Sequence, residues 1–141
     1  MLRLDVTCDP ARIDFDRVYR FLNAHSNWAQ GIPRALFERA MEHSLCFAGS
    51  LAGEQIAFAR VVSDRATFAN LVDVFVEAPY RGNGHATALL TEVFRHPELQ
   101  GLRRFTLATS DAHELYQRFG FHTPARPDTL MERYAPDIYK R

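Results

Sequence analysis

A glycine-rich turn at residues 81–86, Arg-Gly-Asn-Gly-His-Ala, carries the strongest chemical signal in the sequence, because it follows the apolar run LVDVFVEAPY and precedes a helical pattern. Main-chain N–H groups in such a turn have no intrahelical partner, and they point with the positive end of the helix dipole at one spot. Gly82 and Gly84 would let a phosphate approach closely and would take a positive φ at little steric cost. Arg81 adds a charged donor. The turn therefore predicts a phosphate or pyrophosphate site; the alternative is a plain connection of turn-prone residues.

Two familiar phosphate motifs do not fit this turn. A P-loop requires lysine after its second glycine, where His85 stands, and a dinucleotide fingerprint requires glycine or alanine at Thr87. The hexapeptide instead resembles the R/Q-x-x-G-x-G/A acetyl-coenzyme A motif of the GNAT superfamily of N-acetyltransferases. The segment DAHELYQRFGF, about thirty residues later, resembles a second signature of that superfamily, A-x-x-L-Y-x-x-x-G-F, from Ala112 to Phe121.

This resemblance implies a cofactor site and a reaction. Acetyl-coenzyme A would be bound by main-chain amides of the turn and, through its pantetheine arm, by the exposed edge of the preceding strand. The implied cofactor-binding residues are Val74, Phe75, Val76, Arg81, Gly82, Asn83, Gly84, His85, Ala86 and Thr87. The implied activity moves an acetyl group to a primary amine, for which we expect a small molecule, by direct attack without an acyl-enzyme. The alternative is a non-catalytic module that binds coenzyme A as a sensor or regulator.

Tyr116 is the first candidate catalytic residue. It occupies the position at which many members of the superfamily place a general acid near the coenzyme A sulfur, and a phenol with an ordinary pKa near 10 can protonate a thiolate at neutral pH. The other interpretation is core packing, because Tyr116 shares a helical face with Ala112, Leu115 and Phe119. One departure from the signature is Thr109, which stands where many relatives have an asparagine that contacts the pantetheine arm.

Asp73 and Trp28 are the candidates for binding the acceptor amine. Asp73 interrupts the apolar run from Leu71 to Val76, and a carboxylate there must be paired or must face a cleft. It would bind or deprotonate the acceptor, or it would form a salt bridge with an arginine such as Arg60. Trp28, the single tryptophan, lies where the superfamily walls the acceptor pocket; anchoring of two helices is the alternative.

The hydrophobic periodicity predicts the elements that position these residues. We expect helices over 14–25 and from Pro33 onward, then a hairpin over 44–64 with its turn at 49–54. A strand over 67–76, a helix that begins at 86 and ends before Pro97, a strand over 103–109 and a helix over 112–119 capped by Asp111 should follow. A strand near 3–7 and two closing strands, at 121–122 and 129–134, complete the pattern. The predicted fold is α+β: a single domain, residues 1–141, with a mixed, mostly antiparallel sheet of six to seven strands and about four helices, as the GNAT resemblance implies.

The amino-acid composition argues against several classes of partner and cofactor. Seventeen basic and seventeen acidic residues balance, which argues against nucleic acid or an anionic membrane. Lys140 is the single lysine, so a lysine Schiff base is not expected. Neither the six histidines nor the two cysteines fall at metal-ligand spacing, and we predict no metal. We expect a cytoplasmic protein, since the sequence has no signal-peptide pattern, no membrane-length apolar stretch and no disulfide framework. A homodimer is left open.

Overall fold

A single five-stranded sheet organises the computed structural model, which describes residues 3–140. The strands are β1 (Asp5–Thr7), β2 (Leu45–Leu51), β3 (Glu54–Ser63), β4 (Phe68–Val76) and β5 (Arg104–Leu107), and they lie side by side in that order. Neighbouring strands run antiparallel except β4 and β5, which are parallel. The α+β class and the mixed sheet are thus confirmed, but the predicted six to seven strands were wrong.

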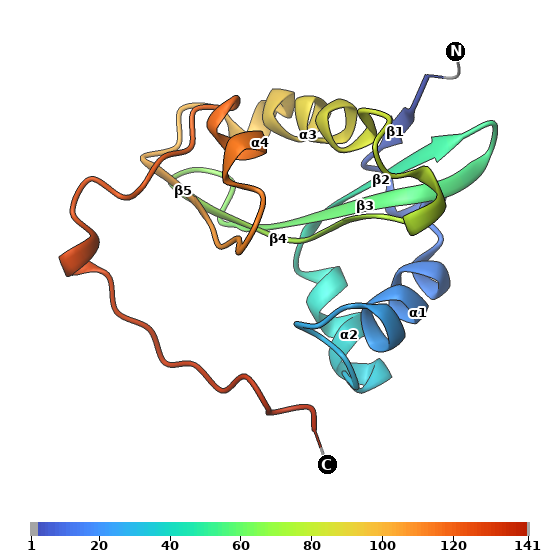
Figure 1. Cartoon of the computed structure of the whole chain (residues 1–141), viewed down its shortest axis with the longest axis horizontal. Helices are drawn as coiled ribbons and strands as arrows, with labels where there is room; N and C mark the ends of the chain where they lie inside the picture. The colour runs from blue at the N-terminus through green and yellow to red at the C-terminus, as the bar shows by residue number, and fades with distance from the viewer. Residues whose placement is uncertain (1–2, 141) are drawn as a thin grey trace.

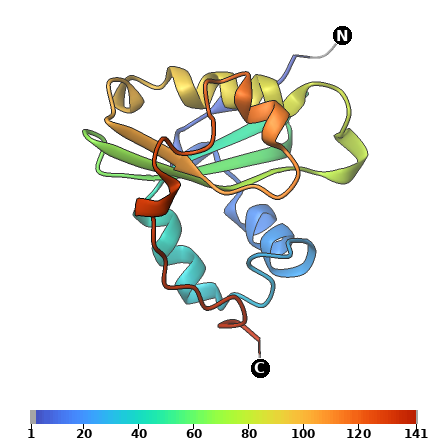
Figure 2. The ribbon, with the colours of Figure 1, turned by 60° about the vertical axis from the view of Figure 1, so that its left-hand side comes forward.

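Two helices cover each face of the sheet, as Figures 1 and 2 show. The helices α1 (Phe15–His25) and α2 (Arg34–Glu42) lie on one side, and α3 (His85–Arg95) and α4 (His113–Gln117) lie on the other. Each pair encloses its own hydrophobic cluster, because the side chains of a central strand alternate between the two faces. Burial on both faces explains why β2 and β3 are apolar almost throughout.

The helices form where the periodicity predicts them. Val18, Phe21 and Leu22 give α1 one buried face, and the Asp14 carboxylate caps its first turn by accepting from the Arg17 N–H at 3.0 Å. In α3, Leu89, Leu90 and Val93 are fully buried against the sheet. The β2–β3 hairpin is also confirmed, with its turn at Ala52 and Gly53, whose φ values of 48° and 85° suit a two-residue loop.

The carboxyl end of β4 departs from regular sheet geometry. Phe58 pairs with Phe75 and Arg60 with Val72, so β4 carries an extra residue in this interval, and Asp73 there has a φ of 54°. Such a bulge bends its strand and increases the local twist. The pairing of β4 with β5 ends at Leu71 and Leu107. Beyond that point the two strands separate, and the sheet opens at the end that leads into the glycine turn.

Two predictions near the C-terminus were wrong. Residues 121–122 and 129–134 form no strand; the segment contains a single short helical turn, Pro127–Thr129, and passes outside the sheet toward α1 and α2 (Figure 2). Prolines at 124, 127 and 136 lie just outside the two predicted segments, and because proline has no N–H donor, strand pairing could not extend through these positions. Asp111 does not cap α4 either: the N-cap is Ala112, whose N–H donates to Thr109 Oγ1 at 3.0 Å.

Candidate active site

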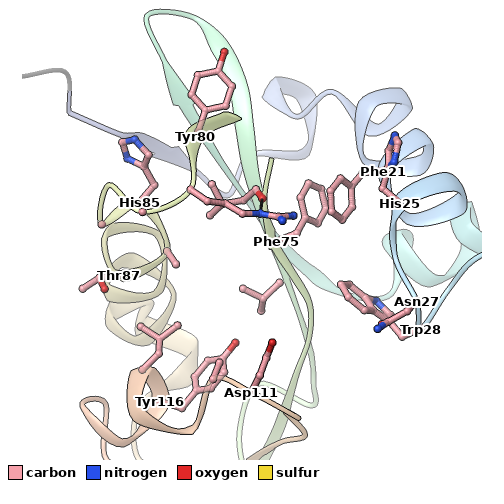
Figure 3. A pocket seen from close by; sticks show the side chains of 18 residues that line it. Phe21, His25, Asn27, Trp28, Phe75, Tyr80, His85, Thr87, Asp111 and Tyr116 are labelled. Carbon is pink, nitrogen blue, oxygen red and sulfur yellow. Dashed lines mark hydrogen bonds between the residues drawn. The ribbon is translucent and has the colours of Figure 1, made fainter. Parts of the chain in front are cut away.

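A cleft of about 530 Å³ opens where β4 and β5 separate, and four parts of the chain line it. They are the end of α1 with the loop after it, the end of β4, the glycine turn with the start of α3, and the loop that leads into α4 (Figure 3). Nine of the ten predicted cofactor residues line this cleft, together with Tyr116 and Trp28. The tenth, Asn83, turns its amide to the carbonyls of Tyr80 and Arg81, at 3.3 and 3.1 Å.

The glycine turn has the backbone geometry of an anion site. Gly82 and Gly84 have φ values of 80° and 79°, and Gly84 is the N-cap of α3. Among the hydrogen bonds of residues 3–140, none is donated by a main-chain N–H of residues 82–87. An added Cβ at either glycine would meet no atom within 4 Å, so the space in front of the turn is open. These free donors and the dipole of an eleven-residue helix suit a phosphate or pyrophosphate.

The end of β4 provides free main-chain groups beside this turn. Since β4 pairs with β5 only from Phe68 to Leu71, residues 72–76 have no strand partner on that side. The carbonyl of Val76 accepts from Arg81 Nε at 2.8 Å, so Arg81 braces the turn against the strand. An extended ligand could add to the remaining edge in the manner of a strand.

Tyr116 stands on α4 at the far end of the cleft from the turn. The residue is 8% exposed and belongs to the core cluster under α3, and its side chain also lines the cleft. Packing and exposure to the cleft are therefore compatible. Burial raises the pKa of its phenol, and the negative charge of Asp111 raises this pKa further. The phenol is held in its protonated form at neutral pH.

Asp73 lies just outside the lining of the cleft, and both of its carboxylate oxygens are engaged. Oδ2 accepts from Arg60 Nε at 2.7 Å, and Oδ1 accepts from the indole Nε1 of Trp28 at 2.7 Å. The Asp73 side chain is 8% exposed and that of Arg60 18%. The sequence left a salt bridge with Arg60 open, and the structure contains it. The bond to Trp28 was not foreseen.

These contacts continue to α2. Arg60 also donates to Ser44 Oγ at 3.0 Å, and Ser44 Oγ donates to the carbonyl of Ala40 at 2.7 Å. A connected set of hydrogen bonds therefore runs from Trp28 at the cleft, through Asp73 and Arg60, to the end of α2.

The wall opposite α4 is aromatic. The rings of Phe21 and Phe75 stack with their centroids 3.8 Å apart and their planes 8° apart. Trp28 is 48% exposed, and His25 and Asn27 complete this side (Figure 3). Sequence reasoning missed Phe21, His25 and Asn27 as cleft residues, since the pattern of α1 indicates only a buried face.

Asp111 is a further cleft residue that sequence reasoning did not identify as part of the site. It was expected to cap α4, whereas its side chain points into the cleft near Tyr116 (Figure 3). A signal did exist: Asp111 precedes a signature that places a tyrosine in the site. Local sequence cannot distinguish a capping carboxylate from one that faces a ligand.

Residues 3–140 contain no group of three or more His, Cys, Asp or Glu side chains arranged to hold a metal ion. None of the helices within that range is long and apolar enough to cross a membrane.

Comparison with known proteins agrees with this geometry. The model of the acetyltransferase (GNAT) family matches residues 14–121. A crystal structure from Xanthomonas campestris pv. campestris, of a protein assigned to the GNAT family, is 52% identical with a TM-score of 0.96, covering 100% of this chain and 99% of that one. A GNAT acetyltransferase from Elizabethkingia anophelis, solved with acetyl-CoA bound, has the same fold at 14% identity: its TM-score is 0.66, over 92% of this chain and 86% of that one. A curated Gibberella zeae protein, named provisionally as an acetyltransferase, is 27% identical over 79% of this chain and 74% of its own length.

Proposed function

The chain belongs to the GNAT family of acetyltransferases, and from that premise we propose that it transfers the acetyl group of acetyl-CoA to a primary amine of a small molecule. The observation that carries the proposal is the arrangement of the cleft. An anion-binding turn lies at one end and a protonated tyrosine at the other, with an unpaired strand edge along the side. The three features suit, in that order, the pyrophosphate, the reacting thioester and the pantetheine arm of one ligand.

The glycine turn would hold the pyrophosphate. The free N–H groups of residues 82–87 provide the donors, and the absence of side chains at Gly82 and Gly84 leaves room for the ligand. Asn83 and His85 need contribute only their main chain. The free edge of Val74 to Val76 would pair with the amide groups of the pantetheine arm, which directs the thioester toward α4.

Tyr116 would act as general acid. Acetyl-CoA supplies an activated acetyl group, and its transfer to an amine releases a thiolate that must be protonated. The raised pKa of Tyr116 keeps a proton on the phenol throughout the neutral range, and its position in the cleft lets the O–H face the ligand. Neither cysteine competes as an acyl-carrying nucleophile, because Cys46 is buried outside the cleft and exposed Cys8 also lies outside it. Direct attack by the amine is therefore the favoured route.

Trp28 would form part of the acceptor wall, and Asp73 would act there through Trp28. With both carboxylate oxygens engaged, Asp73 sets the position of the indole. We therefore assign Asp73 a positioning role and reserve direct contact with the acceptor for residues that line the cleft.

Calorimetric titration with acetyl-CoA tests the first half of this proposal. At about 100 times the dissociation constant, binding to the native state should raise the free energy of unfolding by roughly 2.7 kcal/mol, visible as a higher melting temperature. Release of free thiol in the presence of an amine panel tests the second half. Tight binding without thiol release for any amine would favour the non-catalytic sensor, and no binding by a folded sample would refute the cofactor site.

A further inference from the structure

The charged groups of the cleft are unevenly distributed. Asp111 is the one carboxylate among residues 3–140 that lines it. Its carboxylate accepts no hydrogen bond and takes part in no ion pair within the described chain, although arginines make up most of the eight pairs found there. The other carboxylates of this region are engaged: Asp73 with Arg60 and Trp28, and Glu77 with Arg17 at 2.6 Å.

An unpaired carboxylate facing a cleft attracts a cation, and the position of Asp111 limits which cation. It belongs to the loop before α4, and its charge acts on the Tyr116 phenol, so it stands at the reacting end of the cleft. The anion-binding turn lies at the opposite end, at residues 81–87. A ligand cation beside Asp111 would therefore be close to the acetyl group and away from the phosphates.

The wall across from Asp111 specifies the rest of the ligand. Trp28 exposes about half of its surface, and its orientation is set by the 2.7 Å bond to Asp73. The stacked rings of Phe21 and Phe75 continue this wall. Within the described chain, no carboxylate of this aromatic wall lines the cleft, since Asp73 lies behind Trp28 with both oxygens engaged. The wall therefore suits a flat apolar body better than a chain carrying several charges, because each further ammonium would have to be desolvated without a partner.

We propose that Asp111 binds the ammonium of the acceptor and accepts its proton, and that the acceptor is a primary amine on an aromatic body seated against Trp28. This inference rests on the proposed acetyl transfer and names the acceptor class of the same site.

The proton balance of the step is complete. Asp111 takes one proton from the ammonium, which leaves a neutral amine whose nitrogen forms a bond to the acetyl carbon as the carbon–sulfur bond breaks. Tyr116 gives its proton to the departing sulfur and regains one from the nitrogen, which becomes the amide. Asp111 then releases its proton to solvent. The net reaction converts an ammonium and a thioester into an amide, a thiol and one free proton.

Two nearly isosteric probes separate the charge from the shape of the acceptor. Phenethylamine is protonated at neutral pH, whereas O-benzylhydroxylamine, with oxygen in place of one methylene, is neutral. Asp111→Asn should lower kcat/KM for phenethylamine about 10- to 100-fold, the loss expected for a hydrogen bond to a charged group. The loss of kcat/KM for O-benzylhydroxylamine should be much smaller, because this probe carries no ammonium for Asp111 to bind or deprotonate. Calorimetry with each probe on the protein saturated with coenzyme A should give the same pattern in Kd, without turnover.

Asp73→Asn is the matched control, since it removes a second carboxylate close to the same cleft. We expect this variant to lower kcat/KM and to weaken binding for both probes alike, because it loosens Trp28 and leaves the charge of Asp111 in place. Three outcomes would overturn the assignment of Asp111. They are a loss in Asp73→Asn that is confined to phenethylamine, equal losses for both probes in Asp111→Asn, and no loss for either probe in Asp111→Asn. Binding of acetyl-CoA by wild-type protein that binds and acetylates neither probe would overturn the aromatic acceptor and leave the cofactor site intact. Failure of acetyl-CoA to bind would instead refute the proposed function.

Discussion

The indole N–H of Trp28 donates a 2.7 Å hydrogen bond to Oδ1 of Asp73, and Arg60 occupies the other oxygen of the same carboxylate. The two residues that the sequence analysis predicted to bind the acceptor amine are therefore hydrogen-bonded to each other. One stands in the loop after α1 and the other in the bulge of β4, where a φ of 54° departs from regular strand geometry. The bulge, the ion pair and the cleft wall form one structural unit.

Breaking the partly buried ion pair between Arg60 and Asp73 should destabilise the fold. Arg60→Met leaves the Asp73 carboxylate, 8% exposed, without its cation, and we expect a loss of about 3 kcal/mol in the free energy of unfolding. Adding Asp73→Asn to Arg60→Met removes the unpaired charge and should recover part of that loss. Urea denaturation of the two single variants and the double variant measures the coupling. Strictly additive losses would mean that the pair contributes no interaction energy.

Removing the hydroxyl group of Tyr116 should slow the reaction without weakening the binding of acetyl-CoA. Tyr116→Phe preserves the packing of the ring and deletes the proton donor, so kcat should fall about 10²- to 10⁴-fold while the Kd for acetyl-CoA stays close to that of wild type. Because the pKa of Tyr116 is raised, wild-type kcat should not decline from phenol ionisation below about pH 10. Tyr134→Phe, at a residue 72% exposed in the C-terminal segment, is the control. Unchanged turnover in Tyr116→Phe would remove this residue from the mechanism.

A side chain in the glycine turn should weaken cofactor binding. Gly84→Val places a β-branched residue at a φ of 79°, which is strained even though the space is open, and the turn must shift its N–H groups. We expect the affinity for acetyl-CoA to fall at least about tenfold, a change of about 1.4 kcal/mol in calorimetry. Gly53→Val introduces a similar strain, at a φ of 85° in the β2–β3 turn away from the cleft. Equal affinities for the two folded variants would refute the role of the turn.

Stability in acid should depend on Asp64. Its carboxylate accepts from the N–H groups of Ala66, Thr67 and Phe68 and from the Thr67 hydroxyl, which hold its pKa well below the ordinary value. Since the folded pKa is depressed, this stabilisation is present above the unfolded pKa of about 3.9 and is lost as the pH falls below it.

Asp64→Asn should therefore lower the urea midpoint at pH 7 and show a smaller further loss below about pH 4 than wild type does. Asp128→Asn makes the same change of charge at a carboxylate that has no hydrogen-bond partner among residues 3–140, and it should follow wild type. An Asp64→Asn variant whose midpoint ran parallel to wild type through this range would contradict the prediction.

The sequence pattern was sufficient to predict those elements whose structure is decided within a short stretch of chain. Leu89, Leu90 and Val93 recur at helical spacing and are buried, so α3 was predictable, and so was the glycine turn at its start. The same holds for α1 and for the β2–β3 hairpin. In each case, side-chain periodicity or backbone preference within a short stretch decides the structure.

Pairing between distant segments was not predictable in this way. Residues 121–122 and 129–134 were predicted to be closing strands, yet the chain there passes outside the sheet toward α1 and α2 and forms no strand. A strand exists only when a partner edge satisfies its main-chain groups, and the partner is chosen by the fold.

The sequence alone thus determined the family, the glycine turn before α3 and the tyrosine of the later signature, because these depend on residue types at short spacings. Tertiary structure alone decided which carboxylate is free. Asp73 and Trp28 are 45 residues apart, and only folding brings the indole and Arg60 to that carboxylate while leaving Asp111 open to the cleft. The role of a charged side chain is set by the partners that surround it in space, and those partners come from distant parts of the chain.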